Sequence, residues 1–303
     1  MMSRSFADRL TSAFPGEVKF QEPMKYHTSF GIGGPAECLA TVKSLDELRL
    51  LLSLADEYRQ PVFILGRGTN ILVRDGGIRG LVIRLDGEFT KAGVQRHELI
   101  GGAACPLSSL LRLSVQHKLS GLEFATGIPG AFGGAVCMNA GSAEEGIGSL
   151  VRDIHLVYAD GSTGVLPAGS LNFSYRHCSL PEGSIITAIA LQLSQVEHKE
   201  IILARIKERY TERLKSQPLR DRSAGCIFRN PPGESAGRLI DQAGLKGLSI
   251  GGAQISTIHA NFIINREGAS CFDVVRLIDV IREKVYQSSG FTLETEVLLV
   301  GEG

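Results

Sequence analysis

Four segments of the chain carry apolar residues at the spacing of an amphipathic helix. Residues 44–59, 106–118, 197–216 and 270–289 repeat an apolar side chain every three or four positions. The side chains expected to face a core are Leu45, Leu48, Leu52 and Ala55; Leu107, Leu110, Leu111 and Val115; Ile202, Ile206, Tyr210 and Leu214; and Val274, Ile278, Ile281 and Val285.

Cap signals support these helices, and β-branched runs predict strands between them. Ser44 with Glu47 and Ser270 with Asp273 have the spacing of N-terminal capping boxes, and Gly290 is expected to end the last helix. The predicted strands are residues 38–42, 62–65 and 81–85, several within 151–193 with a turn at Asp160–Gly161, and residues 291–300. The pattern as a whole indicates an α+β protein with a glycine-rich portion to about residue 196 and a separate module after the long third helix.

The terminal strand contains an unusual carboxylate. Because side chains alternate across a strand, Glu296 would share a face with Leu298 and Val300. A carboxylate on a half-buried face costs free energy unless it is paired or useful. Glu296 is therefore either a functional group or a rim glutamate in an ion pair.

The densest glycine segment is residues 121–142, GLEFATGIPGAFGGAVCMNAGS, with six glycines among small apolar residues. Glycine lets a ligand or another backbone approach closely. The segment carries one charge, so a solvated linker is excluded. It indicates backbone wrapped against a large flat or phosphorylated ligand; the alternative is a tightly packed structural turn.

A second glycine cluster, GRGTNILVRDGG at residues 66–77, lies between two predicted strands. Its backbone N–H groups can form a nest for an anion such as a pyrophosphate. It is not a Rossmann fingerprint, because Ile71 occupies the position of the third glycine and no long helix follows.

Composition and charge argue against several classes of function. The chain has 303 residues, 36 of them glycine, and a formal net charge of zero, which gives no sign of a nucleic-acid or membrane surface. The N-terminus has no apolar targeting segment, so a cytoplasmic protein is expected. Six scattered cysteines without a C-x-x-C pair argue against zinc and against a disulfide framework.

Three further positions could carry chemistry. Cys226 lies in SAGCIFRNPP, where the alternative is a packed hydrophobe. Arg176, beside Tyr175 in NFSYRHC, could stabilise an anion through its guanidinium, or be a surface residue. His259 in HANFIIN is either a core imidazole or a ligand contact.

These segments together resemble the UDP-N-acetylenolpyruvoylglucosamine reductases of peptidoglycan synthesis. The resemblance rests on eight ordered landmarks that span the chain from about residue 23, namely YHTSFGIGGPAE, LGRGTNILVRDGG, GLEFATGIPGAFGGAVCMNAG, NFSYRHC, SAGCIFRNPP, AGRLIDQAGLKGLSIGGAQIS, HANFIIN and LETEVLLVG. The chain looks like the shorter, type II-like subtype of that family.

The resemblance implies a non-Rossmann, PCMH-type fold with two FAD-binding subdomains, expected at 1–85 and 86–196, and an α+β substrate-binding domain at 197–303. It implies non-covalent FAD, with NADPH as reductant, and a sugar-nucleotide substrate. A monomer is expected. The implied FAD-binding residues are Gly66, Arg67, Gly68, Thr69, Asn70, Ile71, Ile128, Pro129, Gly130, Gly133, Gly134, Ala135, Asn139, Ala140 and Gly141.

By the same resemblance, the catalytic residues are Arg176, Cys226 and Glu296, and the substrate-binding residues are Tyr175, Arg213, Asn230 and His259. Cys226 occupies the position of the proton donor, which is usually serine in the family. A thiol, with an ordinary pKa of about 8.5, is mostly protonated at neutral pH and can fill this role. Two alternatives remain at this point, a flavoprotein oxidase or dehydrogenase of the same fold, and a catalytically silent binding protein.

Overall fold

The structure is a computed structural model that describes residues 4–141 and 145–303; Ser142, at the end of the glycine-dense segment, lies outside the described residues. The chain forms two compact units. Unit 1 comprises Met1–Lys19, Leu39–Arg67 and Gly80–Glu212, and unit 2 comprises Phe20–Cys38, Gly68–Arg79 and Arg213–Gly303. Helices and strands occur in both units, so the predicted α+β class is confirmed.

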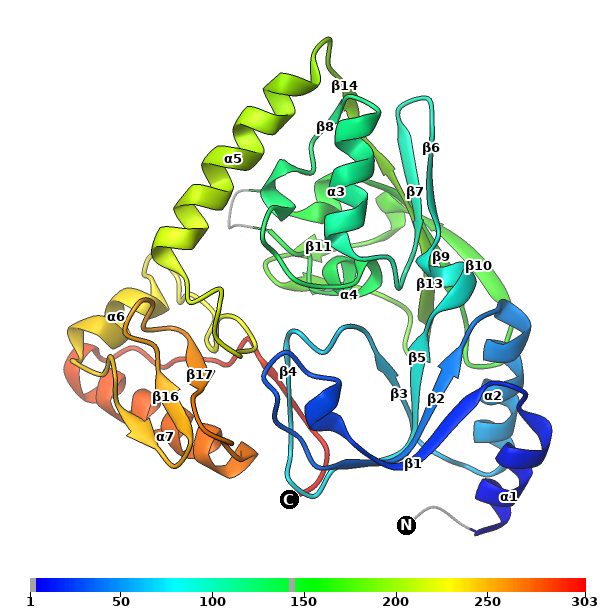
Figure 1. Ribbon diagram of the computed structural model, residues 1–303, viewed down its shortest axis with the longest axis horizontal. Coiled ribbons are helices and arrows are strands. Elements are labelled where there is room, and N and C mark those ends of the chain that lie inside the picture. The colour runs from blue at the N-terminus through cyan, green and yellow to red at the C-terminus, as the bar shows by residue number, and fades with distance from the viewer. Residues whose placement is uncertain (1–3, 142–144) are drawn as a thin grey trace. The chain divides into compact units, whose positions relative to one another are not determined.

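Unit 1 contains an antiparallel sheet of five strands in the order β10-β9-β13-β7-β6. Helices α3 and α4 lie beside β7 (Figure 1). Both helices pack closely against Gly101 of β7, since a Cβ there would lie 3.0 Å from Leu110 of α3 and 3.1 Å from Phe132 of α4. The bounds are β6 Ala92–Gln95, β7 Glu98–Gly102, α3 Leu107–Gln116, α4 Phe132–Cys137, β9 Val151–Val157, β10 Thr163–Pro167 and β13 Ile185–Gln192.

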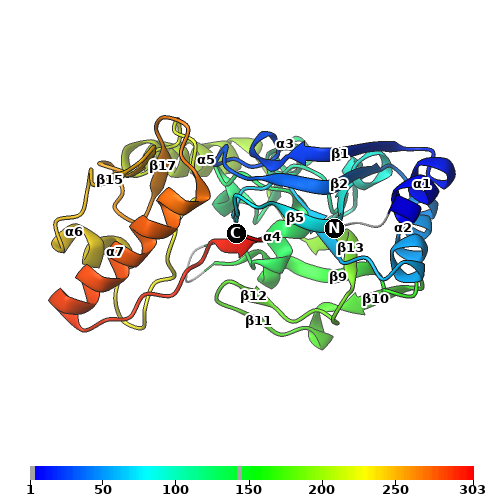
Figure 2. The same cartoon turned by 90° about the horizontal axis from the view of Figure 1, so that it is seen from below.

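A second sheet has the order β1-β2-β5-β3, in which β3 runs parallel to β5. Strands β1, β2 and β5 each run across a boundary between the two units. In unit 1, helices α1 and α2 lie side by side (Figures 1 and 2), with Phe6 and Tyr58 rings 5.6 Å apart. The bounds are α1 Arg4–Ala13, β1 Glu17–Pro23, β2 Pro35–Val42, α2 Leu45–Glu57, β3 Val62–Leu65 and β5 Ile78–Leu85.

The predicted cap of α2 is confirmed in part. The Ser44 side chain accepts a hydrogen bond from the Glu47 N–H, as expected. The Glu47 carboxylate, however, accepts at 2.6 Å from the N–H of Lys43. The reciprocal bond of a capping box is thus displaced by one residue.

The remaining elements of unit 1 are short, apart from α5. They are β8 Leu119–Ser120, β11 Phe173–Ser174, β12 His177–Cys178, β14 Ser194–Gln195 and α5 Lys199–Ser216, which passes into unit 2, together with the 3₁₀ helices Gly87–Thr90, Glu123–Ala125, Ile147–Leu150 and Ala168–Ser170. The turn predicted at Asp160–Gly161 is confirmed between β9 and β10, with Gly161 at φ +79°.

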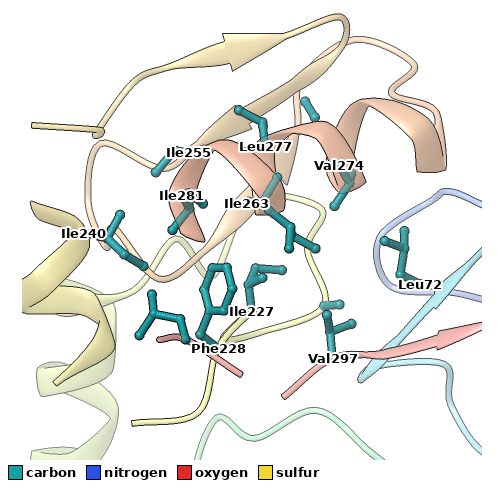
Figure 3. Close-up of a cluster of buried hydrophobic side chains, with 14 of the residues drawn as sticks. Leu72, Ile227, Phe228, Ile240, Ile255, Ile263, Val274, Leu277, Ile281 and Val297 are labelled. Atoms are coloured by element: carbon teal, nitrogen blue, oxygen red, sulfur yellow. The ribbon is translucent and has the colours of Figure 1, made fainter. Parts of the chain in front are cut away.

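In unit 2, a long helix packs on a small antiparallel sheet. Helix α7 contacts β15 and β16 of the sheet β15-β16-β17. The buried cluster in Figure 3 joins Val274, Leu277 and Ile281 of this helix to Ile227 and Phe228. The bounds are the 3₁₀ helix Met24–Tyr26, β4 Ile71–Val73, α6 Ala236–Gln242, β15 Ser249–Ile250, β16 Ala253–Ile255, β17 Ile263–Asn265, α7 Cys271–Ser289 and β18 Leu298–Val300.

Two predictions from periodicity are wrong. In α5 only Ile202 of the expected stripe is buried, while Tyr210 and Leu214 are exposed. The terminal strand is confined to β18, which pairs in parallel with β4, and residues 291–297 are irregular apart from a bridge between Thr295 and Phe228. Within the described residues, none of the helices combines the length and hydropathy that a bilayer crossing needs.

Candidate active site

The glycine cluster at residues 66–77 turns sharply after β3 and enters a strand, not a helix. Gly68 has φ +60°, and a Cβ there would collide with the carbonyl oxygen of His27, so the chain itself requires glycine. The Asn70 side chain donates to the Glu296 carbonyl at 3.2 Å, and the Asn70 carbonyl accepts from the Leu298 N–H at 3.0 Å. Asn70 therefore ties this loop to the C-terminal segment of unit 2.

The glycine-dense segment 121–142 contains α4, and two adjacent glycines of this helix differ in their surroundings. A Cβ at Gly133 would lie 2.9 Å from the Cβ of Ala103, whereas a Cβ at Gly134 would meet nothing within 4 Å. Gly66, in the cluster at residues 66–77, is also open, because a Cβ there would meet only the Ala131 Cβ, at 3.9 Å. Packing explains Gly133, while Gly134 and Gly66 expose backbone that a ligand can approach.

A cavity of about 550 Å³ in unit 1 lies against this segment. It is lined by four predicted cofactor-binding residues, Arg67, Ile128, Pro129 and Gly130, and by apolar side chains of α3 and α5, namely Leu111, Val115, Leu203 and Ile206. Leu111 and Val115 are half-buried. Of the four side chains of α3 that were expected to face the core, Leu107 and Leu110 are buried, whereas Leu111 and Val115 line the cavity.

Asn139, another predicted cofactor residue, holds three segments of unit 1 together. Its Oδ1 accepts from the Gly148 N–H at 2.9 Å, and its Nδ2 donates to the Ser174 carbonyl at 3.0 Å. Its own backbone has φ +40°. The side chain thus orients the hairpin β11–β12 beside the end of α4.

Arg176 occupies the tight turn of that hairpin. It has a left-handed backbone, φ +57°, and its Nη1 donates to the Gly141 carbonyl at 2.8 Å. The guanidinium carbon lies 5.3 Å from the centre of the Tyr175 ring. A residue held in this backbone region between two anchors is a feature typical of functional sites.

Cys226 and Glu296 belong to neighbouring segments of unit 2. The Glu296 N–H donates to the Ile227 carbonyl at 2.8 Å, and the Arg229 N–H donates to the Glu294 carbonyl at 2.9 Å. Glu296 is 9 % exposed. Its burial was expected, but the predicted reason was wrong, because Leu298, the supposed neighbour on its face, is 48 % exposed. Irregular backbone, not strand alternation, turns Glu296 inward.

His259 lies in the same unit on the turn before β17. Its Nδ1 accepts from the Asn261 N–H at 3.2 Å, and its ring meets the edge of Phe262. Burial, with a smaller effect of Lys246, lowers the pKa of His259. The ring is therefore neutral at physiological pH, and because Nδ1 accepts, its proton is on Nε2.

Two predicted substrate residues have less defined surroundings. Arg213 is in the last turn of α5, where its carbonyl accepts from the Gln217 N–H. Asn230 is exposed, and its Oδ1 accepts from the Ala236 N–H at the start of α6 at 3.0 Å. Both belong to unit 2 with Cys226, Glu296 and His259, whereas Arg176 and Tyr175 belong to unit 1.

Asn261 was missed by the sequence reasoning. It is 3 % exposed, and its amide group bonds at both ends to the backbone of Phe228, two residues after Cys226. Its place in HANFIIN offered a signal, because an amide within an apolar run needs buried partners.

Most thiols of the chain are inert packing groups, as expected. Cys38, Cys105, Cys178 and Cys271 are buried, Cys137 is exposed and Cys226 is intermediate. Burial raises the pKa of Cys38 to about 12 and those of Cys178 and Cys271 to about 11. In the described part of the chain, His, Cys, Asp and Glu side chains form no group that could hold a metal.

Comparisons with known proteins agree over most of the chain. An FAD-binding domain family matches residues 36–166, and the C-terminal domain family of UDP-N-acetylenolpyruvoylglucosamine reductase matches residues 217–300. UDP-N-acetylenolpyruvoylglucosamine reductase 2 of Symbiobacterium thermophilum is 41 % identical over 297 residues, which cover 97 % of this chain and 96 % of that protein. The reductase of Heliobacterium modesticaldum is 40 % identical, with 97 % and 94 % covered. The crystal structure of the Thermus caldophilus reductase superposes with a TM-score of 0.83 at 39 % identity, covering 94 % of this chain and 99 % of that one.

Proposed function

Because this chain belongs to the UDP-N-acetylenolpyruvoylglucosamine reductase family, we propose that it reduces UDP-N-acetylglucosamine enolpyruvate to UDP-N-acetylmuramate with NADPH. The chain is an FAD-dependent oxidoreductase of peptidoglycan precursor synthesis, with the non-Rossmann FAD-binding fold expected from its sequence. The observation that carries the proposal is full-length similarity together with Cys226 and Glu296 on hydrogen-bonded segments of unit 2.

The residues present fit FAD. Gly66 and Gly134 expose backbone where added side-chain atoms would meet open space or only distant neighbours, which suits close approach of a pyrophosphate or ring. The apolar cavity beside Ile128 and Pro129 has the size and lining of a cofactor pocket. FAD, when bound, supplies hydride transfer from NADPH to the terminal vinyl carbon of the substrate.

Arg176 is proposed to stabilise the negative charge that develops on the substrate carboxylate. Its guanidinium presents a planar fork suited to a carboxylate, and the Gly141 carbonyl and the Tyr175 ring orient it. Glu296 is proposed to act on the same charge, either protonated or through a shared proton.

Cys226 is proposed to give its proton to the carbon adjacent to the one that receives hydride. The Sγ–H bond breaks as the new C–H bond forms, which completes the lactyl ether, and solvent reprotonates the thiolate. A thiol is mostly protonated at neutral pH and is a stronger acid than the hydroxyl usual at this position. Asn230, Arg213, Tyr175 and His259 are proposed to contact the sugar nucleotide.

Three expectations stay predictions. They are the division into 1–85, 86–196 and 197–303, the monomeric state and the cytoplasmic location. The match of residues 217–300 to the reductase C-terminal domain favours the reductase over an oxidase of the same FAD-binding fold and over a silent binding protein.

Anaerobic spectroscopy tests the proposed function. The purified yellow protein should bleach on addition of NADPH, and the colour should return on addition of the enolpyruvyl sugar nucleotide, with one product formed per flavin. UDP-N-acetylglucosamine, which lacks the enolpyruvyl group, is the control. Bleaching without recovery on the enolpyruvyl substrate would exclude the proposed reaction and leave the oxidase class.

A further inference from the structure

The segment that carries Cys226 is held on one side by a single buried side chain. The Phe228 N–H donates to Oδ1 of Asn261 at 2.9 Å, and Nδ2 of Asn261 donates to the Phe228 carbonyl at 2.8 Å. The side-chain amide of Asn261 thus bonds to both backbone groups of Phe228, as a residue of a neighbouring β-strand would. Both bonds are buried, where a lost partner leaves a polar group unsatisfied.

The backbone of Asn261 and its neighbour Phe262 also pair with this segment. Its carbonyl accepts from the Ile227 N–H at 2.8 Å, and Phe262 pairs with Cys226 in an isolated bridge. On the other side, the Glu296 N–H donates to the Ile227 carbonyl at 2.8 Å. Cys226 therefore stands at the start of a segment clamped between Asn261 and Glu296.

The same residue orients His259. The Asn261 N–H donates to Nδ1 of the imidazole at 3.2 Å, so that Nε2 carries the proton and is the donor left for another group. Ser256 supports this turn, because its Oγ accepts from the Ile258 N–H at 3.1 Å. One residue thus fixes both a proposed proton donor and a proposed substrate contact.

We propose that Asn261 is a positioning residue, which sets the place of the Cys226 thiol and of the His259 ring for the half-reaction with substrate. It does not touch the reacting atoms. A general acid must lie within hydrogen-bond reach of the carbon that it protonates, and a misplacement of about 1 Å can cost roughly a hundredfold in rate. The inference rests on the proposed role of Cys226.

Asn261→Asp is the sharpest variant. A protonated aspartic acid reproduces both bonds to Phe228, since its O–H donates and its C=O accepts, whereas the ionised form has no donor and repels the Phe228 carbonyl. Burial and this repulsion raise the pKa of such a carboxyl above its ordinary value of about 3.9. Substrate turnover of Asn261→Asp, divided by that of the native enzyme at the same pH, should therefore rise as the pH is lowered from about 8 to about 5.

Dividing the turnover of the variant by that of the native enzyme cancels pH effects that the two proteins share through the other ionisable groups near this segment, Cys226, Glu296, His259 and Lys246. Asn261→Ala should slow anaerobic substrate reduction roughly a hundredfold while reduction of the flavin by NADPH is unchanged. Asn265→Ala is the matched control. Its side chain also bonds to backbone at both ends, to Phe30 and Ala269, but not to the Cys226 segment.

A second readout does not depend on activity. The rate of iodoacetamide labelling at Cys226, measured by peptide mass spectrometry, should change several-fold in Asn261→Ala relative to the rate in the native enzyme. Unchanged relative labelling, or equal effects of Asn261→Ala and Asn265→Ala on substrate reduction, would overturn the positioning role. If native enzyme fails with substrate but the labelling changes as expected, the proposed function is wrong and the positioning of Cys226 stands.

Discussion

At the scale of single residues, we predict that two adjacent glycines are required for different reasons. Gly134 of α4 faces open space, whereas Gly133 packs against Ala103. Gly134→Leu should therefore fold normally but purify without flavin. Gly133→Leu should be destabilised by about 1–3 kcal/mol through overpacking. The flavin-to-protein absorbance ratio and the thermal unfolding of the apoproteins check this, and a fully flavinated Gly134→Leu protein would contradict the assignment of α4 to the cofactor site.

Glu123 is a buried carboxylate with a structural task. It is 5 % exposed, and it accepts hydrogen bonds from Ser120 Oγ and the Gly121 N–H, both at 2.7 Å, with Arg205 at 3.4 Å. Burial by itself raises the pKa of Glu123, but the hydrogen bonds from Ser120 and from backbone N–H groups, with the charge of Arg205, outweigh burial and lower it.

The sign of the pH effect follows from that lowered pKa. The carboxylate stabilises the fold above its unfolded pKa of about 4.3, and this contribution is lost as the pH falls through the lower folded value. Glu123→Gln should cost about 1–3 kcal/mol at neutral pH, and the difference from native should shrink in acid. Urea unfolding at several pH values measures it; a constant difference would assign the effect to packing instead.

At the scale of elements, α7 is capped by residues from two distant parts of the chain. Ser270 and Asp273 form the predicted capping box, confirmed in the structure. Asp75 adds a cap that the sequence did not reveal, because its carboxylate accepts from the N–H groups of Cys271 at 2.9 Å and Phe272 at 3.0 Å. Negative charge at a helix N-terminus is also favoured by the helix dipole.

Asp75→Ala should therefore destabilise the protein by about 1–2 kcal/mol, at least as much as Ser270→Ala. The two substitutions remove acceptors from the same helix end, and each leaves N–H groups of the first turn without a protein partner. Denaturant unfolding of the apoproteins gives both values. An Asp75→Ala protein as stable as native would show that water replaces the carboxylate at no cost.

The helices and strands also show which structural features the hydrophobic pattern predicts and which it does not. Helices α2, α3 and α7 begin within two residues of their predicted starts, because caps and turn residues mark them locally. The stripe of α5 was mispredicted since Tyr210 and Leu214 repeat at helical spacing without being buried. Residues 291–297 read as a strand, but Glu294 and Glu296 bond through their backbone to the Cys226 segment, a partner that periodicity does not reveal.

At the scale of the whole molecule, the chain leaves and re-enters unit 2. Residues 20–38 and 68–79 cluster with the C-terminal ninety-one residues, Arg213–Gly303, and β4 pairs with β18. The landmark motifs identified the family and named Cys226, Glu296 and Arg176, but no local pattern revealed which residues Asn261 and Asp75 contact. Those contacts join residues far apart in sequence, separated by 33 positions for Phe228 and Asn261 and by 196 for Asp75 and Cys271.

Arg176 and Cys226 belong to different units, and both are assigned to the half-reaction with substrate. Arg176→Lys should lose most substrate reduction while the flavin is still reduced by NADPH, because lysine keeps the charge but loses the planar fork. Stopped-flow measurement of each half-reaction separates the two steps. An equal fall in both rates would mean that Arg176 supports the fold or the flavin instead.

The most direct measurement is anaerobic single-turnover reduction of the enolpyruvyl sugar nucleotide by NADPH-reduced Cys226→Ala and Cys226→Ser proteins. Cys226→Ser should remain active, because a hydroxyl is the usual donor in the family. Cys226→Ala should accept electrons from NADPH at the native rate yet form product about a hundred- to ten-thousand-fold more slowly, the typical cost of losing a general acid. If Cys226→Ala forms product as fast as the native enzyme, Cys226 is a packing residue and the proton comes from another group.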